Sequence, residues 1–215
     1  HGFNAELIPN LIDLENYPYR HRRQLQPRLL WMRSFHPLWN PEMALRVFRR
    51  VHDHLPHAVL VMAGQDKGFQ AQTMELARDL NLGDAVRFPG FLNEEAKIRE
   101  GSTADIFLNT NRVDNMPVSV VEACALGLPV VATKVGGIPD LLTDGDNALL
   151  VPDNDDVRMA DGVLRLLNDP DLAGRLSANA RRLAEQSAWK RVGPEWQRVI
   201  TPHTQPVAAS LIGIA

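Results

Sequence analysis

Residues 105–133 read DIFLNTNRVDNMPVSVVEACALGLPVVAT, and this stretch decides the fold. It opens with a short apolar run, passes through a polar loop to Pro117 and continues with an apolar run of helical character. After a Gly-Leu-Pro turn it ends in a second short apolar run. Two apolar strands joined by a helix form a βαβ unit, in which the strands lie parallel in a sheet that helices cover on both faces.

The same alternation continues on both sides of this stretch. Further strands are expected at 28–33, 58–64, 85–90 and 147–151. Two helices are expected to start at Asn40-Pro41-Glu42 and at Asn93. Four others are expected at 69–80, 155–167, 169–186 and 190–200. Strands that alternate with helices predict an α/β fold with a doubly wound parallel sheet, Rossmann-like in architecture. Ligands bind beyond the carboxyl ends of the strands in such sheets.

Composition and charge limit the classes of function. The chain has 215 residues, of which 45% are hydrophobic, and a formal net charge of −3. A slightly acidic chain gives no electrostatic reason to expect nonspecific binding of nucleic acid, which requires a basic face, so no such partner is expected. One cysteine allows no intrachain disulfide and fits a reducing, cytoplasmic location. No apolar run reaches the roughly 20 residues that span a bilayer, although the tail PVAASLIGIA leaves peripheral contact with the inner membrane face open.

Several patterns suggest chemistry and have simpler interpretations. The dinucleotide fingerprint G-x-G-x-x-G is absent, which disfavours a nicotinamide site. His52, His54 and His57 stand at the end of an expected helix, where the dipole favours histidine, and no acidic or cysteine pattern completes a metal site. Residues 144–146 read Asp-Gly-Asp, which is typical of a turn. Cys124 lies in an apolar helical run, which favours a packed thiol over a nucleophile.

Asp114 and Glu122 are the candidate pair of functional acids. They stand eight positions apart, which on one helix would place them roughly 80° from each other. Pro117 separates them and favours a helix start, so we expect Asp114 in a loop and Glu122 in the second helical turn. A helix N-terminus binds phosphate, and carboxylates beside it accept hydrogen bonds from sugar hydroxyls. A nucleotide-sugar meets both demands. The spacing alone equally permits a loop acid and a solvated helix acid.

At these residues the sequence resembles the C-terminal, donor-binding domain of retaining GT-B glycosyltransferases of family four. The signature of that family is an acid, seven residues, Glu, and then Ala-x-Ala-x-Gly-x-Pro-Val-Val-Ala, which here reads DNMPVSVVEACALGLPVVAT, with Asp114 where Glu is usual. The resemblance extends to IPNLID, VLVMAGQDKG, VRFPGFLNEE, ADIFLNT and KVGGIPDLLTDGDNALLVPDND. It covers residues 6–200 and implies the C-terminal lobe of a GT-B fold.

The resemblance also implies a role for each candidate residue. Glu122 would hold the ribose hydroxyls, Asp114 the transferred sugar and Arg33 the pyrophosphate, and these three form the catalytic set. Gly90, Phe91 and Leu92 would contact the base. Donor contacts are expected from Gly90, Phe91, Leu92, Asn115, Met116, Pro117, Val118, Ser119 and Glu122. The implied reaction is glycosyl transfer from UDP-sugar or another NDP-sugar with retention of configuration, without an essential metal and without a further cofactor.

Two departures qualify this expectation. The family usually has a lysine five positions after the arginine, where this chain has Leu38. His36, Arg112 and Lys134 are candidate substitutes. The chain begins at His1, and the N-terminal GT-B lobe with the acceptor site is missing, so we expect a fragment of a larger enzyme. The alternatives are a non-catalytic nucleotide-sugar-binding module and a sugar-nucleotide epimerase of similar fold.

The expected domain organisation has three parts. Residues 1–27 carry no strong period and are expected to be an interdomain linker. Residues 28–187 are expected to form the nucleotide-sugar-binding domain. Residues 188–215 would form a C-terminal helix and tail.

Overall fold

The computed structural model describes residue 8 and residues 10–201. The predictions about the tail PVAASLIGIA, about residues 1–7 and about Pro9 concern positions outside this part of the chain. The three domain boundaries stay predictions.

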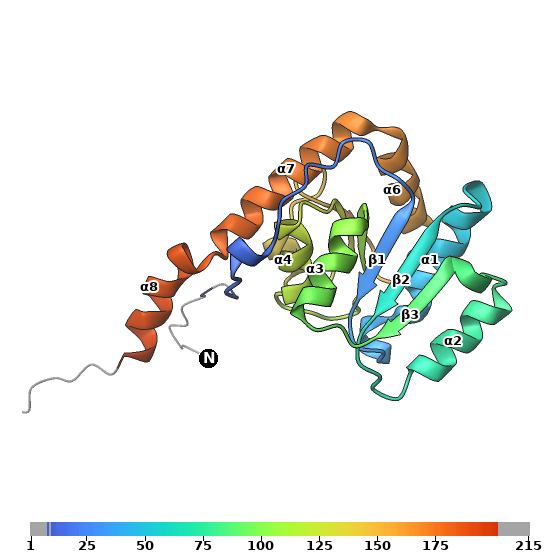
Figure 1. Ribbon diagram of the computed structural model, residues 1–215, viewed down its shortest axis with the longest axis horizontal. Coiled ribbons are helices and arrows are strands. Elements are labelled where there is room, and N and C mark those ends of the chain that lie inside the picture. The colour runs from blue at the N-terminus through green and yellow to red at the C-terminus, as the bar shows by residue number, and fades with distance from the viewer. Residues whose placement is uncertain (1–7, 9, 202–215) are drawn as a thin grey trace, which may run out of the picture.

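The described chain folds around a six-stranded parallel sheet (Figure 1). The strands are β1 (Arg28–Met32), β2 (Val59–Ala63), β3 (Val86–Gly90), β4 (Ile106–Asn109), β5 (Val130–Thr133) and β6 (Leu149–Val151). Their order is β3-β2-β1-β4-β5-β6. The chain therefore winds outward from β1 in one direction and from β4 in the other, and the doubly wound sheet is confirmed. The switch point lies beyond the carboxyl ends of β1 and β4, where such folds bind ligands.

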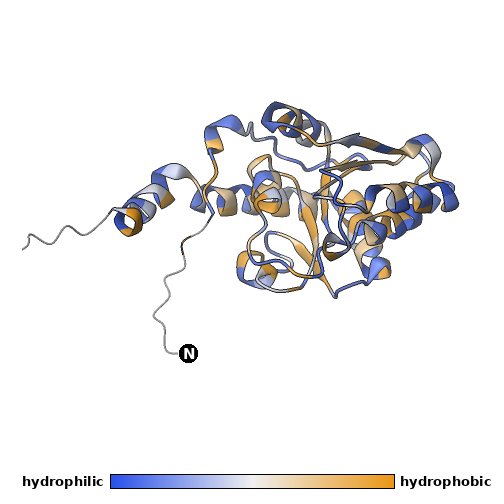
Figure 2. Cartoon of the chain, turned by 90° about the horizontal axis from the view of Figure 1, so that it is seen from below, coloured by the Kyte–Doolittle hydropathy of each residue, from blue (hydrophilic) through white to orange (hydrophobic). Residues whose placement is uncertain are grey.

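Helices cover both faces of the sheet. They are α1 (Pro41–His54), α2 (Gln70–Asp79), α3 (Glu94–Thr103), α4 (Val118–Ala125), α5 (Ile138–Leu141), α6 (Asp156–Asn168), α7 (Pro170–Gln186) and α8 (Trp189–Ile200). One face packs against α1, α2 and α6, and the other against α3 and α4, because successive strand residues point to opposite faces. Trp31 thus joins the α1 side and Leu30 the α4 side. Figure 2 shows hydrophobic residues concentrated along the central strands.

The lead-in to the first strand lies against the domain although its sequence has no period. It runs along α7 before entering β1 (Figure 1), and Ile12 bridges to Ala188, the cap residue of α8 that follows that helix. Arg22 is buried and donates to the carbonyls of Gly101 and Ala104 at the end of α3 and of Leu126 at the end of α4. A cation at the C-terminal ends of two helices satisfies carbonyls that lack helical partners.

Two helix starts differ from the sequence-based expectation. Asn40 precedes α1 in the left-handed conformation, whereas cap residues usually have extended backbone, and its side chain makes no cap bond. Its amide nitrogen donates to the Asn154 side-chain oxygen. Pro117 is the cap residue of α4 rather than its first helical residue. The cap predicted at Asn93 is confirmed, since its side chain accepts from the Ala96 N–H at 2.9 Å.

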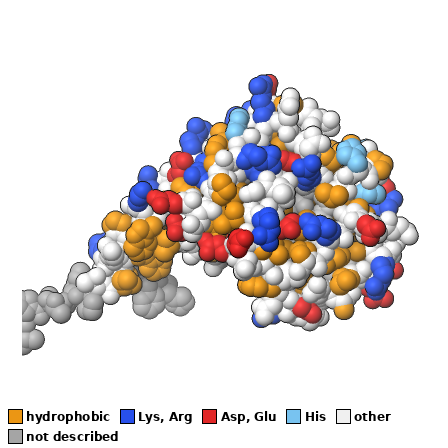
Figure 3. All heavy atoms as spheres, viewed as in Figure 1, with side chains coloured by type: hydrophobic (Ala, Val, Ile, Leu, Met, Phe, Trp, Pro, Cys, Tyr) orange, Lys and Arg blue, Asp and Glu red, His pale blue; other side chains and the backbone are white. Residues whose placement is uncertain are grey.

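The simpler interpretations of the other patterns agree with the contacts. His54 bonds to the Arg50 carbonyl at the end of α1, and no group of three or more His, Cys, Asp or Glu side chains among the described residues could hold a metal. Asp144 accepts from the Leu150 N–H across a turn. None of the helices in the described part of the chain has the length and apolar character needed to cross a membrane. Figure 3 shows charged side chains of both signs interspersed over one face.

Candidate functional site

A pocket of about 290 Å³ opens at the switch point of the sheet. It is lined by residues that follow β1, β2 and β3 and by two helices: Met32, Arg33, Ser34, Trp39, Ala63, Gly64, Gln65, Phe91, Leu92, Lys97, Ser119 and Glu122. The edge of the sheet is tight here, because the Gly64 N–H donates to the Gly90 carbonyl at 2.8 Å and a Cβ on Gly64 would overlap the Arg33 carbonyl. The glycine lets the β1 and β2 ends approach and so fixes where Arg33 leaves the sheet.

Arg33 lies at the centre of the site. Its Nη2 donates to Asp114 Oδ2 at 2.8 Å, and its guanidinium stacks 3.8 Å from the centre of the Trp39 ring. Burial lowers the pKa of Arg33, and the charge of Asp114 opposes that shift. Its Nε is buried and has no hydrogen-bond partner among the described residues. A buried guanidinium nitrogen without a partner lacks a bond that an anionic ligand can supply.

The loop that carries Asp114 is held from two sides. Asp114 Oδ2 also accepts from the Asn111 side chain at 2.8 Å, and the Asp114 carbonyl accepts from the Gly137 N–H at 2.8 Å. Gly136 has a φ of 51°, and a Cβ there would overlap the Asp114 carbonyl. The two glycines after β5 therefore give the Asp114 loop room to lie where it does.

Helix α4 begins beside this loop, as the proline spacing predicts. Ser119 and Glu122 are three residues apart on α4, so they share the face that lines the pocket. Ser119 Oγ is buried and has no hydrogen-bond partner in the described part of the chain. The first N–H groups of a helix lack partners within it. An unpaired hydroxyl in the first turn of α4 thus lines the same pocket as Arg33.

Glu122 is buried and held by two donors. Its Oε1 accepts from the Tyr17 hydroxyl at 3.0 Å and forms an ion pair with Lys97, while only 7% of its side chain is exposed. Burial raises the pKa of Tyr17 and the nearby Glu122 charge raises it further, so the phenol stays a neutral donor. The interpretation of Glu122 as a solvated helix acid is therefore wrong.

The predicted base-contact turn reaches the pocket in part. Phe91 and Leu92 line it, and Phe91 is 76% exposed at its rim. Gly90 does not line it, and its carbonyl is already bonded to Gly64.

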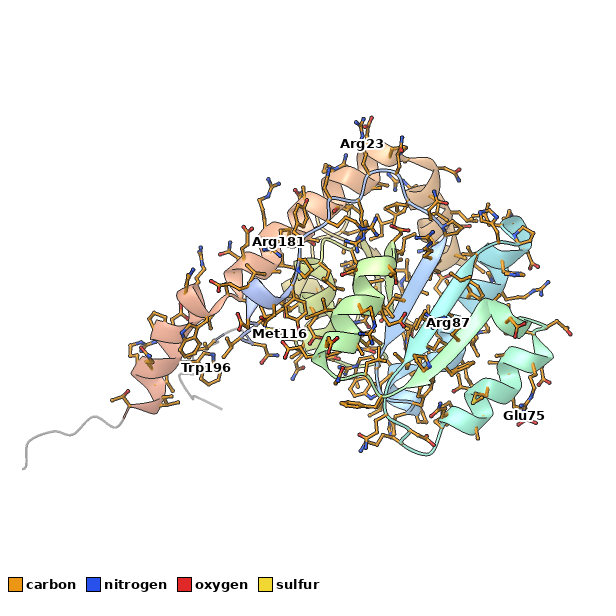
Figure 4. The ribbon with its side chains drawn as sticks, viewed as in Figure 1. Arg23, Glu75, Arg87, Met116, Arg181 and Trp196 are labelled. Atoms are coloured by element: carbon orange, nitrogen blue, oxygen red, sulfur yellow. The ribbon has the colours of Figure 1, made fainter. Side chains whose placement is uncertain are left out.

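A neighbouring hollow of about 490 Å³ contains other predicted donor contacts. Asp114, Asn115 and Met116 line it, and Trp39 lines both this hollow and the first pocket. Asn10 of the lead-in donates to the Met116 carbonyl at 2.9 Å, near the position labelled in Figure 4. Gly90, Pro117 and Val118 line neither cavity. The other predicted donor contacts divide between the first pocket and this hollow, which Trp39 joins.

The candidate substitutes for the missing lysine lie elsewhere. His36 accepts from the Leu38 N–H, Arg112 lies 3.9 Å from Asp153, and neither these nor Lys134 lines the pocket. The second cation of the pocket is Lys97, which sequence reasoning missed. Nothing in the local sequence distinguishes it from other charges on α3, because its role depends on α3 packing beside α4.

Fold and site define the class: a parallel, doubly wound α/β domain with a switch-point pocket suited to a polar, anionic ligand. The model of the family described as glycosyl transferases group 1 matches residues 20–183, and the chain belongs to this family. The resemblance inferred from the motifs is thereby confirmed.

Individual proteins support the assignment. The chain is 30% identical over 163 residues to a D-inositol 3-phosphate glycosyltransferase of Saccharomonospora viridis, covering 72% of this chain and 38% of that protein. Among solved structures, Anabaena HepE in complex with UDP and glucose has a TM-score of 0.80 at 17% identity, covering 92% of this chain and 57% of that one. The C-terminal domain of the group 1 glycosyl transferase LpcC from Francisella tularensis has a TM-score of 0.71 at 18% identity, covering 81% of this chain and 97% of that domain.

These structural neighbours have the GT-B glycosyltransferase fold, which agrees with the predicted fold class. The chain spans about half or less of the length of curated relatives that it matches.

Proposed function

We propose that this chain is the donor-binding lobe of a retaining glycosyltransferase that transfers a glycosyl group from a nucleotide-sugar. One observation carries the proposal: at the switch point, Arg33 Nε and Ser119 Oγ are both buried without partners in the described chain and belong to residues that line one pocket. Buried polar atoms are nearly always satisfied, so two such atoms in one pocket indicate a polar ligand.

The proposed donor spans both cavities. Its diphosphate would lie at Arg33 and the α4 N-terminus, where a full charge and the helix dipole stabilise an anion. Its ribose would lie at Glu122 and its base against Phe91 and Leu92 in the first pocket. The transferred sugar would enter the neighbouring hollow at Asp114. Trp39, which lines both cavities, would stand at the junction.

The proposed chemistry follows from where charge develops. When the bond between sugar and diphosphate breaks, negative charge builds on the leaving phosphate, and Arg33 together with the α4 N-terminus would stabilise it. With this charge supplied by the protein, we expect transfer to proceed in the presence of EDTA. Retention of configuration rests on the family resemblance and is tested by the anomeric form of the product.

The nucleotide and the whole enzyme are proposed from the relatives. UDP is the proposed nucleotide because the Anabaena HepE structure holds UDP. Because the chain spans only 38% of the Saccharomonospora relative, we propose that an N-terminal lobe completes the enzyme and brings the acceptor. Action in the cytoplasm, with peripheral contact at the inner membrane face, is proposed from the sequence alone, which has a single cysteine and the apolar tail PVAASLIGIA.

Calorimetric titration of UDP and uridine into the chain and its Arg33→Met variant tests the site. Loss of a charge-assisted contact should weaken UDP binding by about thirtyfold or more and leave uridine nearly unchanged. Arg112→Met is the matched control, because Arg112 lies at the same sheet edge outside the pocket. Equal losses for UDP and uridine in Arg33→Met would contradict a diphosphate at Arg33.

The rival function is a module that binds a nucleotide-sugar without turning it over. Leu38 favours this alternative, because it stands where the family usually has a lysine. Leu38 is exposed and does not line the pocket, so it supplies no charge there. The two-lobed protein separates the candidates: donor binding without transfer supports the module. Conversion of the donor sugar without any acceptor would instead support an epimerase.

A further inference from the structure

Lys97 occupies an unusual place in the donor site. It lies one turn into α3, and its ammonium pairs with Glu122 Oε1, the same oxygen that accepts from the Tyr17 hydroxyl. Both internal donors are thus on one oxygen of the carboxylate. Glu122 Oε2 accepts no hydrogen bond from the described residues, and Glu122 lines the pocket.

The ammonium also has unused capacity. A lysine ammonium has three N–H donors, and Lys97 uses one of them on Glu122. Its side chain remains 27% exposed and lines the pocket together with Phe91 and Leu92. The pocket therefore contains a free carboxylate oxygen beside free ammonium hydrogens.

This combination matches the chemistry of neighbouring hydroxyl groups. A hydroxyl donates one hydrogen and accepts through its oxygen, so full recognition needs an acceptor and a donor together. We propose that Lys97 and Glu122 jointly recognise the two adjacent ribose hydroxyls of the donor nucleotide. Lys97 donates to a hydroxyl oxygen while Glu122 Oε2 accepts a hydroxyl hydrogen. Lys97 is then a residue that makes the site select ribonucleotides over deoxyribonucleotides.

The proposal rests on the proposed function for the ribose at Glu122 and adds the role of Lys97. Position distinguishes Lys97 from its neighbour Arg99 on the same helix. Arg99 is 63% exposed, pairs with Glu95 on the outside of α3 and does not line the pocket. A positive charge on α3 is therefore not enough to recognise the ribose hydroxyls; the proposed recognition requires the contact with Glu122.

The test compares UDP, 2′-deoxy-UDP and 3′-deoxy-UDP by calorimetry on the chain and on Lys97→Met. The unmodified chain should prefer UDP to at least one deoxy analogue. Loss of a hydrogen bond from a charged donor should weaken UDP binding by about tenfold in Lys97→Met. Binding of the deoxy analogue that the unmodified chain disfavours should change little, so the ratio of the two affinities should fall by the same factor. Arg99→Met is the matched control and should retain the full preference.

Lys97→Gln guards against misfolding, since its amide can still donate to Glu122. Its one remaining N–H is uncharged and sits on a shorter side chain, so the charged contact to the hydroxyl oxygen is lost. A folded Lys97→Gln variant should show the same reduced preference, and an unchanged preference overturns the proposal. Equal weakening of all three ligands in Lys97→Met also overturns it, because Lys97 would then act without reading the hydroxyls. If the unmodified chain binds none of the three, it is the proposed function that fails.

Discussion

Replacing Arg22 by Met should destabilise the domain strongly although Arg22 touches no ligand pocket. Arg22 donates to the carbonyls of Ala104 and Gly101 at 3.0 and 2.8 Å, to that of Arg20 at 3.1 Å and to that of Leu126. Burial lowers its pKa to about 9, which expresses the cost of keeping this cation from water. The carbonyls offset that cost only while the guanidinium is present.

The size of the effect follows from these contacts. Methionine fills much of the same volume but leaves the carbonyls of two helix ends without a donor. Each hydrogen bond from a charged donor is worth about 1.5 to 3 kcal/mol, and the desolvation cost of the guanidinium disappears with it, so we expect a net loss of about 3 to 5 kcal/mol. Domains are stable by roughly 5 to 15 kcal/mol in total, so a large part of the stability should be lost. For a chain of this size the melting temperature should fall by about 6 to 20 °C.

Urea unfolding followed by circular dichroism measures this loss. The matched control is Arg23→Met, one residue further on. Arg23 is 65% exposed and pairs only with exposed Asp171, and Figure 4 shows it at the outer edge of the molecule. Its replacement should change stability by less than about 1 kcal/mol. An Arg22→Met variant as stable as the control would refute the role given to the carbonyl contacts.

Three further outcomes are expected. Burial and the Glu122 charge raise the pKa of Tyr17 in the folded protein. The contribution of the neutral hydroxyl to the free energy of unfolding is therefore complete below the pKa of the unfolded chain, about pH 10, and is lost as the pH rises above it. Urea midpoints should decline less at alkaline pH in Tyr17→Phe than in the unmodified chain. Burial raises the pKa of the Cys124 thiol to about 12, so alkylation by iodoacetamide should occur only on unfolding. Gly136→Ala should displace the Asp114 loop and weaken UDP-sugar binding more than UDP binding in calorimetry.

One of these predictions has a matched control variant, and the other two have outcomes that would contradict them. Gly145→Ala introduces the same left-handed strain where the added methyl group meets no atom within 4 Å, so it should leave both affinities unchanged. Rapid alkylation of Cys124 in the native protein would show that the thiol is not enclosed as described. Parallel alkaline curves for the unmodified chain and Tyr17→Phe would mean that the phenol does not titrate with unfolding.

Much of the fold could be predicted from the sequence because the decisive patterns are local. The strand predicted at 28–33 is observed at Arg28–Met32, and the start of α4 lies one residue from the predicted position. A continuous apolar run and a proline at a helix start are both encoded within a few residues. The short helix α5 was missed, since four residues between two glycines and a threonine carry no readable period.

The site was predictable where a residue lies in a loop after its strand or in the motif at the start of α4. Arg33 and Asp114 were placed correctly at one sheet edge, yet their ion pair was not foreseen. Lys97 and Tyr17 reach Glu122 from 25 and 105 positions away along the chain. Their meeting depends on the strand order and on how the lead-in packs, and no local pattern reports either.

The two acid–cation pairs have a consequence for affinity. Asp114 holds Arg33, and Glu122 holds Lys97, before any ligand arrives. Immobilising a long side chain at binding costs about 0.5 to 1.5 kcal/mol each. Here that ordering takes place during folding instead, and each carboxylate keeps one oxygen that accepts no hydrogen bond from the described residues. In the proposed function, the site would act as a preformed receptor, because the side-chain order acquired during folding lowers the entropic penalty of association.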